Sequence, residues 1–349
     1  MAEDAAILDR PVKVVIVDDT RSIRALLRSL LARSPRIEVV GEAADPFEAR
    51  ELIRAVNPDV VTLDVVMPRM DGLSFLEKIM TLRPMPVVMV SSRTKENSYE
   101  AVRALELGAV DCVDRATLGD GTQLIATVLT AAESNVSVYT PNGSNSPEEP
   151  HSDFVWNGRT VVIGSSTGGV DALLKVLGDL PANCAPTVIA QHMPPDFLES
   201  FTQRLDKSSL PKVTLAQSGE RLEPGHIYIA PGGTFHVAIN PRDLKRVQLV
   251  EDQGDQMYIP SVDVLFSSAV ALGSRVVGVM LTGMGSDGAE AMLRMREAGA
   301  HTIVQDSASC VVDGMPRSAR TIGAAVEVTP LQKIGRKIIQ STSKSGRTG

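Results

Sequence analysis

Three aspartates end or directly follow short apolar runs in the first third of the chain. Asp18 and Asp19 come after the run at residues 14–17, and Asp64 follows the run at residues 60–63. Because parallel strands end at one edge of a sheet, we expect the three carboxylates to meet in one crevice. Clustered carboxylates suit Mg²⁺ and leave one carboxylate free as a nucleophile toward a phosphoryl group. The alternative is that each aspartate only forms a loop or caps a helix.

A glycine-rich segment in the middle of the chain, residues 164–169, reads GSSTGG and contains G-x-S-x-G centred on Ser166. It follows an apolar run at 160–163 and precedes a helical pattern at 170–177. A tight turn from strand to helix needs glycines, and it presents the central hydroxyl at the start of the helix. The segment predicts a serine nucleophile, with a phosphate-binding loop or a capping serine as alternatives.

A serine nucleophile needs a base within hydrogen-bond reach and a group that orients the base. His192 is the expected base, because it follows the predicted strand at 187–190 and so lies at the same sheet edge as Ser166. His236, just after a Pro-Gly-Gly turn, is the second candidate. The other histidines lie in a predicted linker or beside apolar runs and are weaker candidates: His151, His226 and His301.

The acid that orients the base is expected from a third strand end. Asp287 lies in the turn LTGMGSDG, after the predicted strand at 276–281. It also begins D-G-A-E, a capping box, so its alternative role is to cap the next helix. Backbone N–H groups around Met284 in the same turn are candidates for binding an oxyanion. The order Ser…His…Asp differs from that of the α/β-hydrolases, so the motif does not imply their fold.

The elements that must position these residues alternate between short apolar runs and helical patterns. This alternation predicts two α/β domains, at residues 1–132 and 154–345, each with a parallel sheet covered by helices on both faces. Residues 133–153 are rich in Ser, Asn, Pro and Glu and are predicted to form a flexible linker.

Composition narrows the classes of function. A length of 349 residues suits two domains, while a net charge of −7 and an aromatic content of 3% argue against a nucleic-acid partner. The three cysteines are widely separated, the first residues do not resemble a signal peptide, and no apolar run reaches about 18 residues. We therefore expect a cytoplasmic protein that does not insert into the membrane.

Residues 12–132 resemble a response-regulator receiver domain, which has a flavodoxin-like fold. The resemblance implies that Asp18, Asp19 and Asp64 bind Mg²⁺. It also implies that Asp64, in LDVVMPRMDG, is phosphorylated from a sensor histidine kinase, and that Ser91 binds the phosphoryl group.

The chain departs from this family at one place. The family has a Lys-Pro pair after the fifth strand, where this chain has Arg115 and Ala116 in GAVDCVDRAT. Arg115 keeps the positive charge that senses the phosphoryl group, but a planar guanidinium is not equivalent to a compact ammonium. We expect Asp64 to accept a phosphoryl group and to be coupled more weakly to the second domain.

Residues 160–318 resemble the catalytic domain of chemotaxis protein-glutamate methylesterases. The resemblance rests on six segments in order: GSSTGG, AQHMPP, APGGTFH, PSVDVLF, LTGMGSDG and VVDGMP. It implies a Rossmann-like hydrolase domain with Ser166 as nucleophile, His192 as base and Asp287 as acid.

The reaction implied by this resemblance is hydrolysis of γ-glutamyl methyl esters on the cytoplasmic helices of chemoreceptors. Glutamate and methanol are the products, deamidation of receptor glutamines is a further expected activity, and no cofactor is expected for the hydrolysis. Two other functions remain open: a nucleotide-binding module that uses residues 164–169, and a transcription factor. The absence of the usual nucleotide motifs, and of a helix-turn-helix pattern, counts against them.

Overall fold

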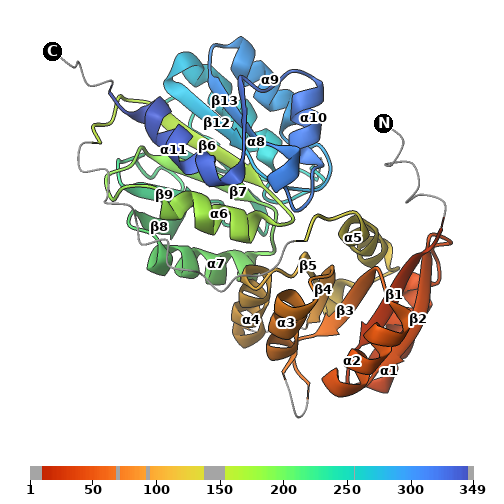
Figure 1. Cartoon of the computed structure of the whole chain (residues 1–349). Coiled ribbons are helices and arrows are strands. Elements are labelled where there is room, and N and C mark those ends of the chain that lie inside the picture. The colour runs from red at the N-terminus through yellow and green to blue at the C-terminus, as the bar shows by residue number, and fades with distance from the viewer. Residues whose placement is uncertain (1–9, 68–70, 92–94, 137–153, 255, 345–349) are drawn as a thin grey trace. The chain divides into compact units, whose positions relative to one another are not determined.

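The computed structural model describes residues 10–67, 71–91, 95–136, 154–254 and 256–344 (Figure 1). The chain divides into two compact units, Met1–Pro141 and Asn142–Gly349. Most of the predicted linker, residues 137–153, lies outside the described residues, so its flexibility and the predicted domain boundaries stay predictions. Among the described residues, no helix has the length and apolar character needed to cross a membrane.

The first unit is a five-stranded parallel sheet with the order β2-β1-β3-β4-β5. This is the flavodoxin-like order that was expected. Helix α1 packs against α5, and α3 packs against α4. The strands are β1 (Val12–Val17), β2 (Ile37–Ala43), β3 (Val60–Asp64), β4 (Val87–Ser91) and β5 (Asp111–Asp114). The helices are α1 (Arg21–Leu31), α2 (Pro46–Val56), α3 (Gly72–Leu82), α4 (Lys95–Glu106), the 3-10 turn η2 (Arg115–Thr117) and α5 (Thr122–Ala132).

Local sequence explains where these elements begin and how they pack. Strands β3 and β4 are buried at every position, as expected for apolar strands covered on both faces. Helix α2 begins at Pro46, directly after its N-cap residue: Asp45 accepts hydrogen bonds from the backbone N–H groups of Phe47 and Glu48. The contacts form a capping box with one variation, because the Glu48 carboxylate accepts from the N–H of Ala44 and not from that of the N-cap residue.

The second unit is built on a seven-stranded parallel sheet with the order β14-β13-β12-β6-β7-β9-β8. Strand β6 lies between β7 and β12, where the strand order reverses, so this is a doubly wound sheet as predicted. The strands are β6 (Thr160–Ser165), β7 (Thr187–Gln191), β8 (Lys212–Leu215), β9 (His226–Ile229), β12 (Val276–Met280), β13 (His301–Gln305) and β14 (Glu327–Thr329).

The helices of this unit form two layers around the sheet (Figure 1). Helices α6, α7 and α11 pack together, and α8, α9 and α10 pack together on the other face. Their bounds are α6 (Gly169–Gly178), α7 (Pro195–Ser208), α8 (Val262–Ala269), α9 (Ala289–Glu297), α10 (Met315–Thr321) and α11 (Leu331–Thr342), with 3-10 turns η3 (Val270–Arg275) and η4 (Ser307–Ser309).

Three strands were not predicted from the sequence. The short edge strand β14 is one of them. The other two, β10 (Phe235–Ile239) and β11 (Val247–Glu251), form a separate antiparallel ribbon. Helix α8 packs on β10, which is buried at four of its five positions. The ribbon therefore extends the core beyond the parallel sheet.

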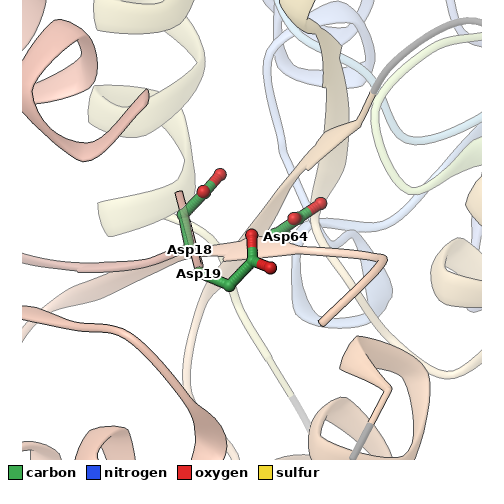
Figure 2. A group of neighbouring side chains, drawn as sticks. All are labelled: Asp18, Asp19 and Asp64. Carbon is green, nitrogen blue, oxygen red and sulfur yellow. The ribbon is translucent and has the colours of Figure 1, made fainter. Parts of the chain in front are cut away.

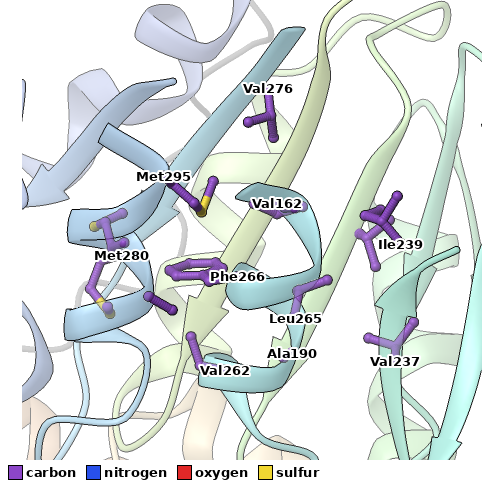
Figure 3. Close-up of a cluster of buried hydrophobic side chains, with 14 of the residues drawn as sticks. Val162, Ala190, Val237, Ile239, Val262, Leu265, Phe266, Val276, Met280 and Met295 are labelled. Atoms are coloured by element: carbon purple, nitrogen blue, oxygen red, sulfur yellow. The ribbon is translucent and has the colours of Figure 1, made fainter. Parts of the chain in front are cut away.

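Helix α8 is held by a large apolar cluster (Figure 3). Val262, Leu265 and Phe266 on this helix are fully buried. Two glycines let the first turn of α8 approach closely, because a Cβ atom on Gly164 or Gly288 would lie 2.2 or 2.3 Å from Val262 Cγ1. The start of α8 is thereby fixed against both β6 and the turn that precedes α9.

Candidate phosphorylation and active sites

The three predicted aspartates meet at the carboxyl ends of β1 and β3 (Figure 2). Asp18 and Asp19 follow β1, and Asp64 is the last residue of β3, its neighbour in the sheet. One carboxylate oxygen from each lies within 4.8 Å of the others. Three oxygen donors at this spacing fit a small, hard divalent cation, and the carboxylate cluster lies where the strand order reverses.

Burial dominates the electrostatics of this cluster. It raises the pKa of Asp18 to about 6, against the opposing effects of the Thr20 N–H and the Arg115 guanidinium. Burial also raises the pKa of Asp64, again opposed by Arg115. Ser91 ends β4 and is 2% exposed. It lies one position beyond Val90, the residue paired with Asp64 in the sheet, so it is at the same edge.

Arg115 lies between two of the three carboxylates. Its Nη2 atom is 2.6 Å from Asp18 Oδ2 and 2.6 Å from Asp64 Oδ1. Its Nε atom is buried and has no hydrogen-bond partner among the described residues. Ala116 donates its backbone N–H to Asp114 Oδ1, at 2.9 Å, which closes the first turn of η2. A proline at position 116 would lose this bond.

The second unit brings Ser166, His192 and Asp287 together, although they come from three different strand ends. His192 Nδ1 is 3.1 Å from Ser166 Oγ, and His192 Nε2 is 2.7 Å from Asp287 Oδ2. Because the aspartate can only accept, Nε2 carries the hydrogen and Nδ1 is left as an acceptor facing the serine hydroxyl. The geometry is the one that an acyl-transfer triad requires of its nucleophile, base and orienting acid.

The backbone of Ser166 is fixed by the strands on both sides of β6. Its N–H donates to the Thr282 carbonyl after β12, at 3.0 Å. Its carbonyl accepts from Gln191 Nε2 at the end of β7, at 2.9 Å. The Gln191 amide is in turn oriented by a 2.6 Å bond from Ser165 Oγ. These contacts leave the Ser166 side chain at the sheet edge, 9% exposed.

Asp287 does not cap the helix that follows it, so the capping-box alternative is wrong. The N-cap of α9 is Gly288, which makes no side-chain cap bond. The carboxylate of Asp287 instead accepts from the first turn of α8. The donors are Ser261 Oγ at 3.1 Å, Val262 N at 2.7 Å and Asp263 N at 3.0 Å.

These donors decide the charge state of Asp287. Burial by itself would raise the pKa of Asp287. The hydrogen bond from His192, the positive charge that His192 carries when it is protonated, and the N–H groups of Val262 and Asp263 outweigh burial and hold the pKa below its ordinary value. A carboxylate at a helix N-terminus is further favoured by the helix dipole. Asp287 therefore stays ionised beside the base.

Two further residues of this site were not predicted from the sequence. Tyr258 stacks on His192, with ring centroids 4.3 Å apart and an interplanar angle of 13°. Ser261 both caps α8, accepting from Val264 N, and donates to Asp287. Its signal was a serine directly before the helical pattern in PSVDVLF, a typical N-cap position.

The remaining candidates occupy other places. His236 is 2% exposed and bonds Asp252 and Ser261, so it is not the base. His226 and His301 open β9 and β13, as strand-edge residues, while His151 lies outside the described residues. Met284 lies in the turn that carries Asp287, next to Gly283. A Cβ atom on Gly283 would lie 2.7 Å from Ser166 Cβ, so this turn passes close to the nucleophile.

Comparisons with known proteins identify the family of each unit. Residues 161–338 match the CheB methylesterase family, and residues 14–128 match the response regulator receiver domain. A Caulobacter vibrioides protein named protein-glutamate methylesterase/protein-glutamine glutaminase 1 is 51% identical over 338 residues, which cover 95% of this chain and 98% of the relative. A Rhizobium etli protein named protein-glutamate methylesterase/protein-glutamine glutaminase is 46% identical over 340 residues, covering 96% of this chain and 98% of the relative.

A solved structure resembles the second unit. The Thermotoga maritima CheB methylesterase catalytic domain aligns with a TM-score of 0.50 and 40% identity, and the match covers 52% of this chain and 98% of that domain. Together with the strand-end triad and the carboxylate crevice, these matches show that the chain belongs to the CheB methylesterase family and carries a response regulator receiver domain.

Proposed function

We propose that this chain hydrolyses γ-glutamyl methyl esters on chemoreceptor proteins, under the control of phosphorylation at Asp64, as part of adaptation in chemotaxis-type signalling. The observation that carries the proposal is the hydrogen-bonded line from Ser166 through His192 to Asp287. Deamidation of receptor glutamines is the second proposed activity, because both reactions are acyl transfers from a glutamyl side chain and need the same nucleophile.

The mechanism follows from the roles of the three side chains. Ser166 Oγ attacks the ester carbonyl carbon while His192 Nδ1 takes the hydroxyl proton. Asp287 accepts the Nε2 hydrogen throughout and stabilises the charged imidazolium. His192 then returns the proton to the leaving methanol, and a water molecule cleaves the acyl-enzyme to give glutamate. Backbone N–H groups near Met284 are the proposed donors to the developing oxyanion.

The receiver unit supplies the regulation. Asp18, Asp19 and Asp64 are the proposed ligands of Mg²⁺, which when bound neutralises charge on an incoming phosphoryl group. A sensor histidine kinase is the proposed phosphodonor. Asp64 accepts the phosphoryl group, and Ser91 and Arg115 contact it. No cofactor is assigned to the hydrolase step. The proposed location is the cytoplasm, where the chemoreceptor helices that carry the methyl esters are exposed.

The test is methanol release from membranes that contain methylated chemoreceptor. Replacing Ser166 or His192 with alanine should each reduce turnover by about 10³-fold or more, and the double replacement should cost little beyond that, because the two residues act as a unit. Full activity in the Ser166→Ala protein would exclude the acyl-enzyme mechanism.

Membership of the CheB methylesterase family counts against the alternative of a nucleotide-binding module that uses residues 164–169, and covalent labelling of the serine tests it directly. The two functions predict different responses of the protein to a serine-directed fluorophosphonate. Labelling of Ser166 that is unaffected by ATP or NAD supports the hydrolase. Absence of labelling, together with protection of the turn by a nucleotide, would support the alternative.

A further inference from the structure

His236 lies outside the triad but is connected to it. The residue is in β10 and is 2% exposed. Its Nδ1 accepts the backbone N–H of Ser261, at 2.9 Å, and its Nε2 is 3.1 Å from Asp252 Oδ1. Because Nδ1 accepts, Nε2 carries the hydrogen and donates it to Asp252. Both ring nitrogens are used, so the orientation of the ring is set from two sides.

Asp252 is itself well placed to hold the ring. It directly follows β11, the partner strand of β10, and its N–H donates to the Thr234 carbonyl just before β10. The second oxygen of its carboxylate accepts from Gly254 N at 2.9 Å. The hydrogen bond to His236 lowers the pKa of Asp252, so the carboxylate is charged and acts as an acceptor.

The other end of the connection is the first turn of α8, from Ser261 to Asp263, which donates hydrogen bonds to Asp287. This turn presents four polar hydrogens in three residues. Those of Ser261 Oγ, Val262 N and Asp263 N point to Asp287, and the fourth, on Ser261 N, points to His236. The hydrogen bond from Ser261 N to His236 fixes the backbone of this turn, and with it the direction of the three donors to Asp287. The orientation of Asp287 then sets that of His192.

We infer that His236, held by Asp252, is a positioning residue of the hydrolase. It fixes the Ser261 turn so that Asp287 keeps the His192 ring within hydrogen-bond distance of Ser166 Oγ. The inference rests on the proposed function. In place of the role of second candidate base, His236 becomes part of a structural link with three steps. His236 donates one hydrogen bond to Asp252 and accepts one from Ser261 N, and the Ser261 turn donates three to Asp287.

Two substitutions separate this role from simple core packing. His236→Leu fills the space but removes the acceptor, which leaves Ser261 N–H buried without a partner. His236→Asn is the conservative variant, because its amide oxygen can lie near the position of Nδ1 and accept from Ser261 N. The matched control is His226→Leu. His226 is likewise a histidine of a strand in this unit, where it stacks on Tyr228 and bonds Thr214 of the neighbouring strand. Among the described residues, it makes no bond to the triad or to the α8 turn.

The first measurement is steady-state methanol release by the full-length protein. His236→Leu should lower kcat by about 10- to 100-fold with little change in KM, because a small misalignment of the base costs this much in turnover. His236→Asn should recover kcat to within about fivefold of wild type, since it restores the acceptor. His226→Leu should leave kcat near the wild-type value.

The second measurement does not depend on activity. The proton between His192 Nε2 and Asp287 should give a low-field proton NMR signal, assigned by its loss in His192→Ala. It should shift or disappear in His236→Leu and persist in His236→Asn and His226→Leu. If His236→Leu does not fold, Asp252→Ala takes its place, because it frees the ring without emptying the core; it should show the same changes to a smaller extent.

Wild-type kcat and an unchanged signal in His236→Leu, or in Asp252→Ala where that variant is used, would overturn the inference. So would an equal loss of kcat in His236→Asn and His236→Leu. These results leave the proposed function intact as long as Ser166→Ala is inactive. An active Ser166→Ala protein would instead remove the proposed function itself, whatever the His236 variants do.

Discussion

Among single residues, Arg115 makes the contact that most changes the expected chemistry of the receiver unit. Its Nη2 atom contacts Asp18 and Asp64 at the same time, at 2.6 Å from each. These are two of the three proposed ligands of Mg²⁺. The guanidinium and a bound cation would therefore compete for the negative charge of the same two carboxylates, and this competition opposes binding of the cation.

Replacing Arg115 with lysine should consequently strengthen Mg²⁺ binding. A lysine side chain is shorter and carries a single point charge, so it bridges the two carboxylates less well and competes less with the cation; we expect Kd to fall by about three- to tenfold. Isothermal titration calorimetry of the full chain measures this change. Arg36→Lys, at an exposed arginine that faces Glu133, is the control and should behave as wild type. Equal or weaker Mg²⁺ binding in Arg115→Lys would show that the bridge does not compete.

Arg115 also bears on how strongly phosphorylation of Asp64 activates the hydrolase. We expect phosphorylation of Asp64 to activate this enzyme less than it activates a relative with Lys-Pro, because a planar guanidinium prefers a forked contact with two oxygens. The cleaner comparison is Arg115→Lys alone, since Ala116→Pro would also remove the N–H that Asp114 accepts. Fold-activation by acetyl phosphate should rise in Arg115→Lys. Identical fold-activation in the two proteins would mean that the arginine is neutral.

A second prediction for a single residue concerns Asp287→Asn. The Oδ2 atom accepts from both His192 Nε2 and Val262 N, so an amide NH₂ placed there would face two donors. Turnover should fall by about 10²-fold, less than for the serine or histidine replacements. Methanol release at saturating substrate measures the loss. Activity near wild type would mean that Asp287 does not orient the base.

The elements position the triad through close packing of α8. Gly164, on β6, and Gly288, before α9, both lie against Val262, so the first turn of α8 is held between the nucleophile strand and the acid turn. Gly164→Ala would place a methyl group 2.2 Å from Val262 Cγ1 and must push α8 away. Overpacking of this kind should lower the free energy of unfolding by about 1–3 kcal/mol. It should also reduce kcat, because Val262 N is a donor to Asp287.

Urea unfolding of the second unit and methanol release together test this effect. Gly178→Ala is the matched control, because Gly178 is also a glycine in this unit but a Cβ atom there meets nothing within 4 Å. It should leave kcat unchanged and keep or slightly raise stability. Unchanged stability and kcat in Gly164→Ala would show that α8 can shift without affecting the acid.

For the whole molecule, the proposed regulation depends on two units that each have their own sheet and core. We expect the receiver to inhibit the hydrolase until Asp64 is phosphorylated, which shifts the population toward an active form. A truncated protein beginning at Phe154 should therefore release methanol faster than the full chain without phosphodonor. The comparison is made at equal concentrations of folded protein. Equal rates would show that the receiver is not inhibitory.

The sequence by itself determined that the chain has two parallel sheets, except for the edge strand β14, and that Asp18, Asp64, Ser166 and His192 lie at strand ends. It could do so because the patterns are local, and because parallel strands bring their carboxyl ends to one edge whatever the details of packing. It also marked Asp287, but it left open whether that carboxylate caps its own helix.

Only the tertiary structure decided what each of these groups touches. Asp287 takes its donors from a helix whose first residues precede it by about 25 positions, and Arg115 bridges to Asp18 across 97 positions. His236 and the ribbon that carries it were not placed by the sequence, because two short strands outside the parallel sheet give a weak pattern. Contacts between residues this far apart depend on how helices and strands pack, and no local pattern of residues encodes that packing.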